Sequence, residues 1–228
     1  MEKLTIKKKR VMMYFIEATQ ELILSEGIKN ISIKKIAEKA GYNTATIYNY
    51  FQNLEVLVLY ASINYLKNYV NDLKAQIKPN MKAIEIYETV YKNFVRHSFE
   101  KPVIFHVLFF GRYSKYLPIV IKKYYQIFPN ELEGQMDIIK NLLNDGNIHS
   151  RDLPIMKKMV DEGSISQHDA PFIMETIVRL HHSYLEDILH ERVTQTLEDY
   201  IKSFFKVFYF LLNIRKEENK SYFITIKY

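Results

Sequence analysis

Short hydroxyl, amide and phenol side chains follow one another closely between residues 43 and 50 of this 228-residue chain. Side chains of these types donate hydrogen bonds to phosphate oxygens, and an alanine or threonine methyl group can touch the methyl group of thymine. No side chain from 44 to 50 is long and charged, so a helix carrying them can approach a DNA groove closely. We therefore predict contacts with double-stranded DNA from Asn43, Thr44, Ala45, Thr46, Tyr48, Asn49 and Tyr50, and from Ser32 upstream.

Two short helices joined by a tight turn must position these side chains. The first is predicted over about 33–40, with Ser32 as its N-cap and an apolar stripe at helical period. Gly41 ends it, because the residue after a helix commonly needs a positive φ, which glycine adopts without a steric clash. Asn43 or Thr44 then caps a second helix over about 44–51. The apolar stripe consists of Ile33, Ile36, Ala37 and Ala40.

A contact between Ala37 and Ile47 is expected to hold the two helices at a steep angle. Caps and stripes alone fit two ordinary surface helices of an all-helical protein about equally well. The joint pattern is more demanding, because a small residue is followed by a glycine four positions later and an aliphatic residue ten positions later. This combination favours a helix-turn-helix.

Positive charge is concentrated in the same part of the chain. The formal net charge is +6, and residues 1–50 contain nine Lys/Arg against five Glu. A basic N-terminal lobe on a nearly neutral body is typical of a nucleic-acid binder with a separate regulatory or assembly domain. The run Lys7, Lys8, Lys9 and Arg10, taken alone, also fits a simple solvated leader.

Two segments of the proposed helix-turn-helix resemble the N-terminal motif of the TetR family of bacterial transcriptional repressors. They are Ile36-Ala37-Glu38-Lys39-Ala40-Gly41 and Thr46-Ile47-Tyr48-Asn49-Tyr50-Phe51, and the resemblance extends over about residues 11–59. It implies that Lys34 also reaches the groove, although this lysine could equally be solvated. The family usually has a phosphate-binding lysine where this chain has Leu54, so one expected backbone contact is missing.

Composition predicts an all-α protein, because 6 Gly and 6 Pro are few for this length and alternating β-branched residues are scarce. We expect about nine helices in two domains: a DNA-binding domain at 1–52 with three helices, and an effector-binding and dimerisation domain at 53–228. No cysteine is present, which excludes disulfides and thiolate metal sites. Without an export signal or a membrane span, a soluble cytoplasmic protein is expected.

A long helix over about 53–78, stopped by Pro79, should connect the two domains. In TetR relatives this helix is the element that ligand binding displaces, and the resemblance implies the same role here. Prolines 102, 118, 129, 154 and 171 punctuate the rest of the chain. The further helices are predicted near 81–98, 102–112, 117–145, 153–162, 171–192 and 195–214.

Aromatic residues crowd into the first part of the predicted body. Core packing is the default explanation for any one of them. Together they also fit an aromatic-walled pocket for a small hydrophobic or cationic effector. The candidate pocket residues are Phe94, Phe105, His106, Phe109, Phe110 and Tyr113.

The last two predicted helices carry wide apolar stripes, and the resemblance implies a four-helix homodimer interface there. Burial within one subunit is the alternative. The candidate interface residues are Ile177, His181, Tyr184, Leu185, Ile188, Phe204, Phe205 and Phe208. We expect no cofactor and no metal, because adjacent histidines such as His181 and His182 diverge by about 100° on a helix. The tail 215–228 has no functional assignment.

These observations predict a ligand-responsive repressor that binds a pseudo-palindromic operator as a dimer. The alternative is an architectural DNA-binding protein without an effector, whose aromatic cluster would be filled by its own side chains. We do not expect an enzyme, because the chain has no glycine-rich phosphate loop, nucleophile elbow or metal-ligand spacing.

Overall fold

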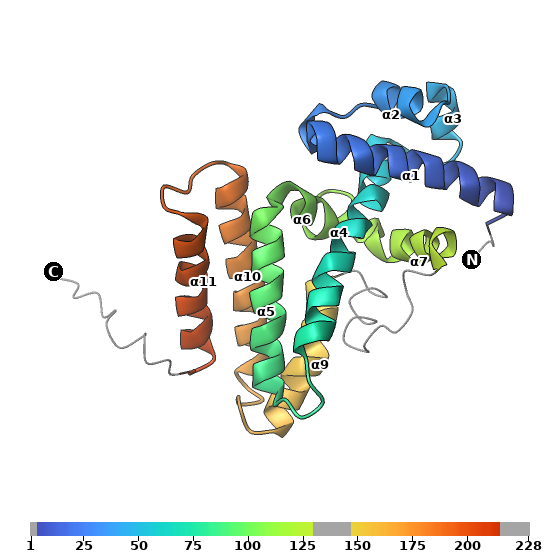
Figure 1. Ribbon diagram of the computed structural model, residues 1–228. Coiled ribbons are helices and arrows are strands. Elements are labelled where there is room, and N and C mark those ends of the chain that lie inside the picture. The colour runs from blue at the N-terminus through green and yellow to red at the C-terminus, as the bar shows by residue number, and fades with distance from the viewer. Residues whose placement is uncertain (1–3, 130–146, 215–228) are drawn as a thin grey trace.

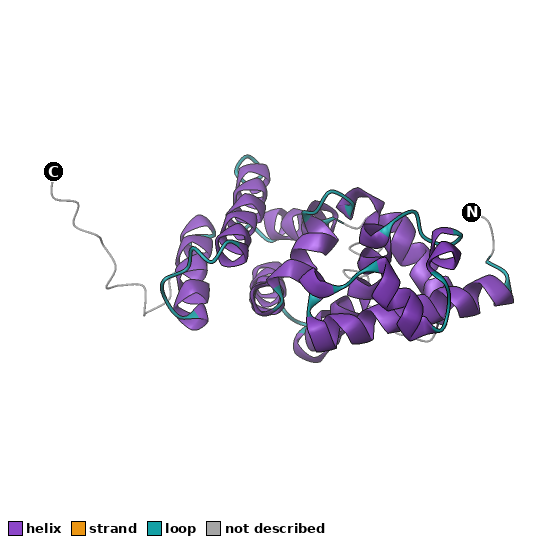
Figure 2. Ribbon diagram, turned by 90° about the horizontal axis from the view of Figure 1, so that it is seen from above, coloured by secondary structure: helices purple, strands orange, loops and turns teal. Residues whose placement is uncertain are grey.

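The computed structural model describes residues 4–129 and 147–214, and its regular elements there are all helical (Figures 1 and 2). These ranges contain ten α-helices, two short 3-10 helices and no strand. The predicted all-α fold is therefore confirmed. None of the described helices combines the length and the apolar character that a membrane span requires.

The N-terminal lobe consists of α1 (Ile6–Glu26), the 3-10 turn η1 (Ile28–Asn30), α2 (Ile33–Ala40) and α3 (Thr44–Tyr48). Thr5 caps α1, since its side chain accepts a hydrogen bond from the backbone of Lys8 at 3.3 Å. Gly27 ends α1 with a φ of 80°. Helices α2 and α3 lie on one side of α1 (Figure 1), as the apolar periodicity of α1 predicts.

Helix α4 (Leu54–Gln76) runs from the lobe into the body (Figure 1). Its 23 residues span about 35 Å, and it packs against α1, α5, α6 and α7. It ends three residues before Pro79, as predicted. An aromatic core joins its first turns to the lobe, because Phe51 lies between Phe15 and Tyr60 at ring-centroid distances of 6.3 and 5.3 Å.

The body is built around α5, which packs against α4, α6, α9, α10 and α11. Helix α11 forms the edge of the body that is remote from the lobe (Figures 1 and 2). The body elements are α5 (Ala83–Glu100), α6 (Pro102–Phe109), η2 (Ser114–Tyr116), α7 (Leu117–Ile127), α9 (Ile148–Asp161), α10 (Ala170–Leu189) and α11 (Leu197–Leu211).

Two helix boundaries in the body differ from the predictions by more than three residues. The expected helix over 117–145 ends at Ile127, because Phe128 precedes Pro129 and has non-helical angles (φ −118°, ψ 68°). Residues 130–146 and the tail 215–228 lie outside the described residues. Helix α9 begins at Ile148, since the Asn147 side chain accepts from the backbone of Ser150 at 2.8 Å. Pro154, expected near a helix start, lies inside α9.

Candidate nucleic-acid interface

The turn between α2 and α3 is fixed by a glycine and an asparagine. Gly41 has the left-handed angles φ 76° and ψ 28°, as predicted, and the backbone N–H of Tyr42 donates to the carbonyl of Ala37 at 2.9 Å. Asn43 caps α3, because its Oδ1 accepts from the backbone N–H of Thr46 at 2.9 Å and from the Thr46 hydroxyl at 2.8 Å. The position of α3 is therefore set by local hydrogen bonds.

The outer surface of α3 carries most of the predicted DNA contacts. The side chains of Asn43, Thr44, Ala45, Tyr48 and Asn49 are exposed, and Tyr48, the largest of them, is 58% exposed. The opposite surface is buried. Ile47 and Ala37, the predicted contact pair, are 0% and 2% exposed.

Two expected DNA contacts lie differently from the prediction. Helix α3 ends at Tyr48 rather than near residue 51. Tyr50 is half-buried, with its ring centroid 6.3 Å from that of Phe15, so it is part of the lobe packing. Thr46 is also half-buried, and its hydroxyl is engaged by Asn43. The sequence pattern missed the burial of Tyr50 because its partner, Phe15, comes from α1.

Helix α2 presents Lys34 to solvent and uses its other lysines to bind α1. The Lys34 side chain is 80% exposed, 3.9 Å from Glu38. Lys35 pairs with Glu26, and Lys39 pairs with Glu21 at 2.7 Å. Ser32 caps α2, since its Oγ accepts from the backbone of Lys35 at 3.3 Å.

The basic start of α1 lies beside the helix-turn-helix. Tyr14 of α1 lies next to Tyr42, with ring centroids 6.4 Å apart, and Tyr42 directly precedes Asn43. Lys7 and Arg10, one to two helical turns before Tyr14, are exposed. The same end of the lobe therefore carries exposed cations next to the polar surface of α3, a combination suited to phosphate contacts.

A hydrogen bond connects the lobe side of α4 to the body. Asn53 caps α4 through its Oδ1, which accepts from the backbone of Val56 at 2.9 Å. The Nδ2 of the same side chain donates to the Tyr113 hydroxyl at 2.8 Å. Tyr113, predicted as a pocket residue, therefore joins the segment after α6 to the first turn of α4.

The other predicted pocket residues belong to an aromatic cluster. Phe94 and Phe105 are 0% and 1% exposed, and the Phe94 ring lies 5.7 Å from Phe105 and 5.5 Å from Phe109. Phe110 and His106 lie toward α10, where the Phe110 ring stacks on His182 at 4.1 Å. The core-packing alternative therefore describes Phe94 and Phe105.

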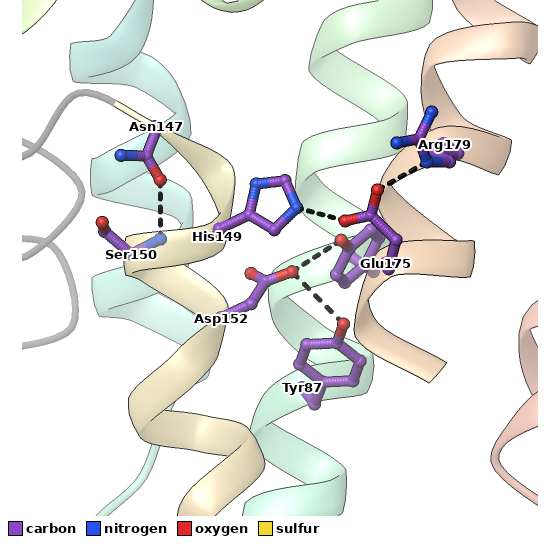
Figure 3. A network of polar contacts seen from close by, with 8 residues as sticks. Tyr87, Asn147, His149, Ser150, Asp152, Glu175 and Arg179 are labelled. Atoms are coloured by element: carbon purple, nitrogen blue, oxygen red, sulfur yellow. Dashed lines mark hydrogen bonds and ion pairs between the residues drawn. The ribbon is translucent and has the colours of Figure 1, made fainter. Parts of the chain in front are cut away.

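A buried ion pair lies beside this cluster. Arg151 and Asp152 are both 0% exposed, and Arg151 Nε donates to Asp152 Oδ1 at 2.6 Å. The hydroxyls of Tyr87 and Tyr91 donate to Asp152 Oδ2 at 3.2 and 2.7 Å; Figure 3 shows the bond from Tyr87. Burial raises the pKa of Tyr91 well above its usual value, and the Asp152 charge raises it further. Both carboxylate oxygens are thus occupied.

Two polar atoms next to this ion pair are buried without a hydrogen-bond partner in the described part of the chain. They are Arg151 Nη2 and His181 Nδ1. The guanidinium carbon of Arg151 and the His181 ring each lie 4.5 Å from the centre of the Phe94 ring. Sequence reasoning missed Arg151, because nothing near it in the sequence indicates that its side chain is buried.

An open cavity of about 370 Å³ lies between α9 and the start of α10. Its apolar lining comes from Leu153, Met156, Val160, Ala170, Pro171 and Met174. None of the predicted pocket residues lines it, because it depends on the packing of two helices whose contact the sequence pattern does not reveal.

Six of the eight predicted dimer residues are buried inside the subunit. These six pack within their own subunit, as the alternative of burial within one subunit anticipates: Ile177, His181, Leu185, Phe204, Phe205 and Phe208. Tyr184 and Ile188 are half-buried. The apolar side chain most exposed on these helices is Phe210 of α11, at 83%.

Comparison with known proteins agrees with the lobe geometry. Residues 15–61 match the family model of bacterial regulatory proteins, tetR family. Comparison with curated protein sequences gives no match.

Two solved structures share the fold. One is FadR from Thermus thermophilus, a TetR-family transcriptional repressor in complex with lauroyl-CoA, with a TM-score of 0.55, 13% identity, and coverage of 90% of this chain and 95% of that one. The other is the fatty acid degradation regulator FadR from Bacillus halodurans, with a TM-score of 0.51, 14% identity and coverage of 91% and 96%. At these identities the likeness concerns the fold.

Proposed function

We propose that this chain, whose residues 15–61 form a tetR-family DNA-binding domain, is a transcriptional repressor that binds operator DNA as a homodimer and is released by a small apolar effector. The observation that carries the proposal is the exposed polar surface of α3, held rigidly by Gly41 and Asn43. Short side chains on a fixed helix suit the major groove, where base edges are distinguishable.

In this proposal α3 reads the bases and the rest of the lobe holds the phosphates. Tyr48 and Asn49 are exposed at the end of α3, and Thr44 and Ala45 are exposed at its start. Lys34 and the basic start of α1 supply the positive charge that neutralises phosphates. Leu54 replaces the family's usual lysine, so these lysines carry more of the electrostatic affinity and a matching share of the salt dependence.

A homodimer is required so that two α3 helices contact successive major grooves, about 34 Å apart. We assign the interface to the outer surfaces of α10 and α11. Phe210 is 83% exposed on α11, and Val207, three residues earlier on the same side of the helix, is half-buried. This surface replaces the buried residues that the sequence pattern indicated.

The effector is proposed to bind in the body beside Arg151 and His181. Arg151 Nη2 is a donor without an acceptor, so a ligand with an apolar part and a hydrogen-bond acceptor would satisfy it. Because Asp152 is already engaged by Arg151, Tyr87 and Tyr91, it offers no vacant oxygen to a cationic effector. The Tyr113–Asn53 hydrogen bond provides a route from the body to α4.

Selection of bound fragments from random double-stranded DNA tests the proposal. The full-length protein should enrich a site with two symmetric half-sites, one helical turn apart between their centres. A symmetric site separates this function from that of a protein that reads only the DNA backbone, which would retain fragments without enrichment. Absence of any retention at low salt would contradict DNA binding altogether.

A further inference from the structure

Three histidines meet one glutamate where α6 packs against α10. His106 comes from the last turn of α6, His182 and Glu186 come from α10, and His190 directly follows α10 as its C-cap. The Nε2 atoms of His106 and His182 lie 3.1 and 3.3 Å from Glu186 Oε1, and His190 Nε2 lies 3.2 Å from Oε2. No other residue trio in the described part of the chain offers comparable metal-ligand atoms within 4.8 Å of one another.

Helical spacing brings the residues of α10 and its C-cap together. Residues 182, 186 and 190 are four apart, so each is rotated only about 40° from the one before it and all three lie on one side of the helix. His181 points elsewhere, into the core, where its Nε2 lies 2.8 Å from the Ser98 hydroxyl. The predicted divergence of the two adjacent histidines therefore holds, but His106 from a distant segment supplies the second imidazole.

The distances fit a small tetrahedral ion. With bonds of about 2.0–2.1 Å, tetrahedral Zn²⁺ holds neighbouring ligand atoms about 3.3 Å apart. The two nitrogen–oxygen distances to Glu186 Oε1 are 3.1 and 3.3 Å. Two imidazoles and a carboxylate are also a known ligand set for zinc, with the fourth position left to water.

The ligand side chains are held in place before any ion binds. Phe110 stacks on the His182 ring at 4.1 Å with an interplanar angle of 4°, which restricts the rotation of the imidazole. His190 contacts Oε2 of Glu186 and so leaves Oε1 directed at His106 and His182. Contacts of this kind around a ligand orient it and raise metal affinity.

We propose that His106, His182 and Glu186 form a binding site for a divalent transition-metal ion, with Zn²⁺ as the best fit, and that His190 positions the glutamate. The site is separate from the DNA-binding surface and adjoins the proposed effector position, because Phe110 stacks on both His181 and His182. Mg²⁺ and Ca²⁺ do not fit this site, because these ions require mainly oxygen donors. Binding ties α6 to α10, and α6 leads directly to Tyr113 and its hydrogen bond with Asn53.

Cobalt titration of the full-length protein, without an affinity tag, tests the site. Co²⁺ should bind with one equivalent per chain and give the intense visible absorption of a four-coordinate ion, and one equivalent of Zn²⁺ should abolish this absorption. H106A and H182A should each weaken Co²⁺ binding at least about 10-fold, the loss that even outer partners of metal ligands cause. E186Q, which keeps the side-chain shape, should weaken it similarly.

H149A is the matched control. His149 also contacts a glutamate across two helices, Glu175 at 2.8 Å, but with a single imidazole (Figure 3). Its loss should leave the titration unchanged. Because His106 and His182 are 34% and 42% exposed, their alanine variants should fold, which circular dichroism checks. Absence of saturable Co²⁺ binding, or binding that H106A and H182A leave unchanged, would overturn the proposal.

Discussion

Tyr48 is the largest side chain that α3 presents to solvent, and its neighbours explain why it is available for DNA. Ile47, one position earlier, is fully buried, and Asn43 fixes the start of the helix. Tyr48 is 58% exposed and contributes little to the core. Function and stability are therefore separable at this residue.

Y48A should weaken binding to the selected operator at least about 10-fold, since a lost specific contact costs about 1–3 kcal/mol. The midpoint of urea unfolding should stay within experimental error, because an exposed side chain buries little apolar area. Fluorescence anisotropy with labelled DNA measures the first quantity. As a control, F172A removes an exposed aromatic ring from α10 and should change neither the operator affinity nor the urea midpoint. Equal operator affinity in Y48A and F172A would show that α3 does not contact the operator bases.

His181 gives the stability of the fold a dependence on pH. Burial, assisted by the Arg151 charge, holds its pKa well below that of an exposed imidazole. The unfolded chain therefore takes up a proton below about pH 6.5 that the folded chain does not. The free energy of unfolding should decrease from this group by up to about 1.4 kcal/mol per pH unit as the pH falls from about 6.5 toward the folded-state pKa.

H181L removes this difference, so the decrease of stability with falling pH should be smaller than in the unsubstituted protein. Urea unfolding at several pH values from 7.5 to 5 measures the two slopes. The comparison uses slopes because the substitution also changes packing against Phe94 and the contact with Ser98. Parallel curves would mean that His181 is protonated in the folded state.

At the scale of elements, the first turn of α4 depends on two hydrogen bonds from one side chain. Asn53 accepts from the backbone of Val56 and donates to Tyr113. Y113F should lower the free energy of unfolding by about 1 kcal/mol through the loss of one bond. N53A should cost more, because it also removes a cap worth about 0.5–2 kcal/mol.

Chemical denaturation of the two variants and the double variant measures these losses. The double variant should be at most about 0.5 kcal/mol less stable than N53A, because the hydrogen bond between the two side chains can be lost only once. Additive losses would mean that Asn53 and Tyr113 do not interact.

Elements defined by neighbouring residues could be predicted from the sequence. Gly41 and Asn43 act within their own turn, so the end of α2 and the start of α3 follow from residue types. The position of Tyr50 could not be predicted, because it depends on Phe15 of another helix. The His106–His182 pair joins segments 76 positions apart, and Arg151 is covered by residues of α4 and α5. Local patterns contain no such information.

At the scale of the whole molecule, the outer surface of α11 is the proposed dimer interface. Phe210 is 83% exposed on the outer surface of α11. A large aromatic side chain in that position has a lower free energy when it is buried in a dimer interface than when it faces water. Burying it contributes about 1.5–3 kcal/mol per copy.

F210K should therefore raise the dimer dissociation constant at least about 100-fold, since two copies of the side chain leave the interface together. Sedimentation equilibrium measures the constant, and operator binding should become steeply dependent on protein concentration. L24K places the same charge on a leucine of α1 that is 74% exposed, and it should leave association unchanged. A monomeric unsubstituted protein would contradict the proposed interface.

Helix α4 is a single uninterrupted rod with its start in the aromatic core of the lobe and its remaining turns in the core of the body. Inserting one residue between Tyr60 and Tyr69 would lengthen it by only about 1.5 Å but turn the lobe by about 100° about the helix axis. The distance between the lobe and the body would hardly change, but the exposed surface of α3 would point in a new direction. The number of residues between Tyr60 and Tyr69 therefore sets the rotation of the lobe about the axis of α4. DNA binding should tolerate insertions or deletions there only when they add or remove whole helical turns.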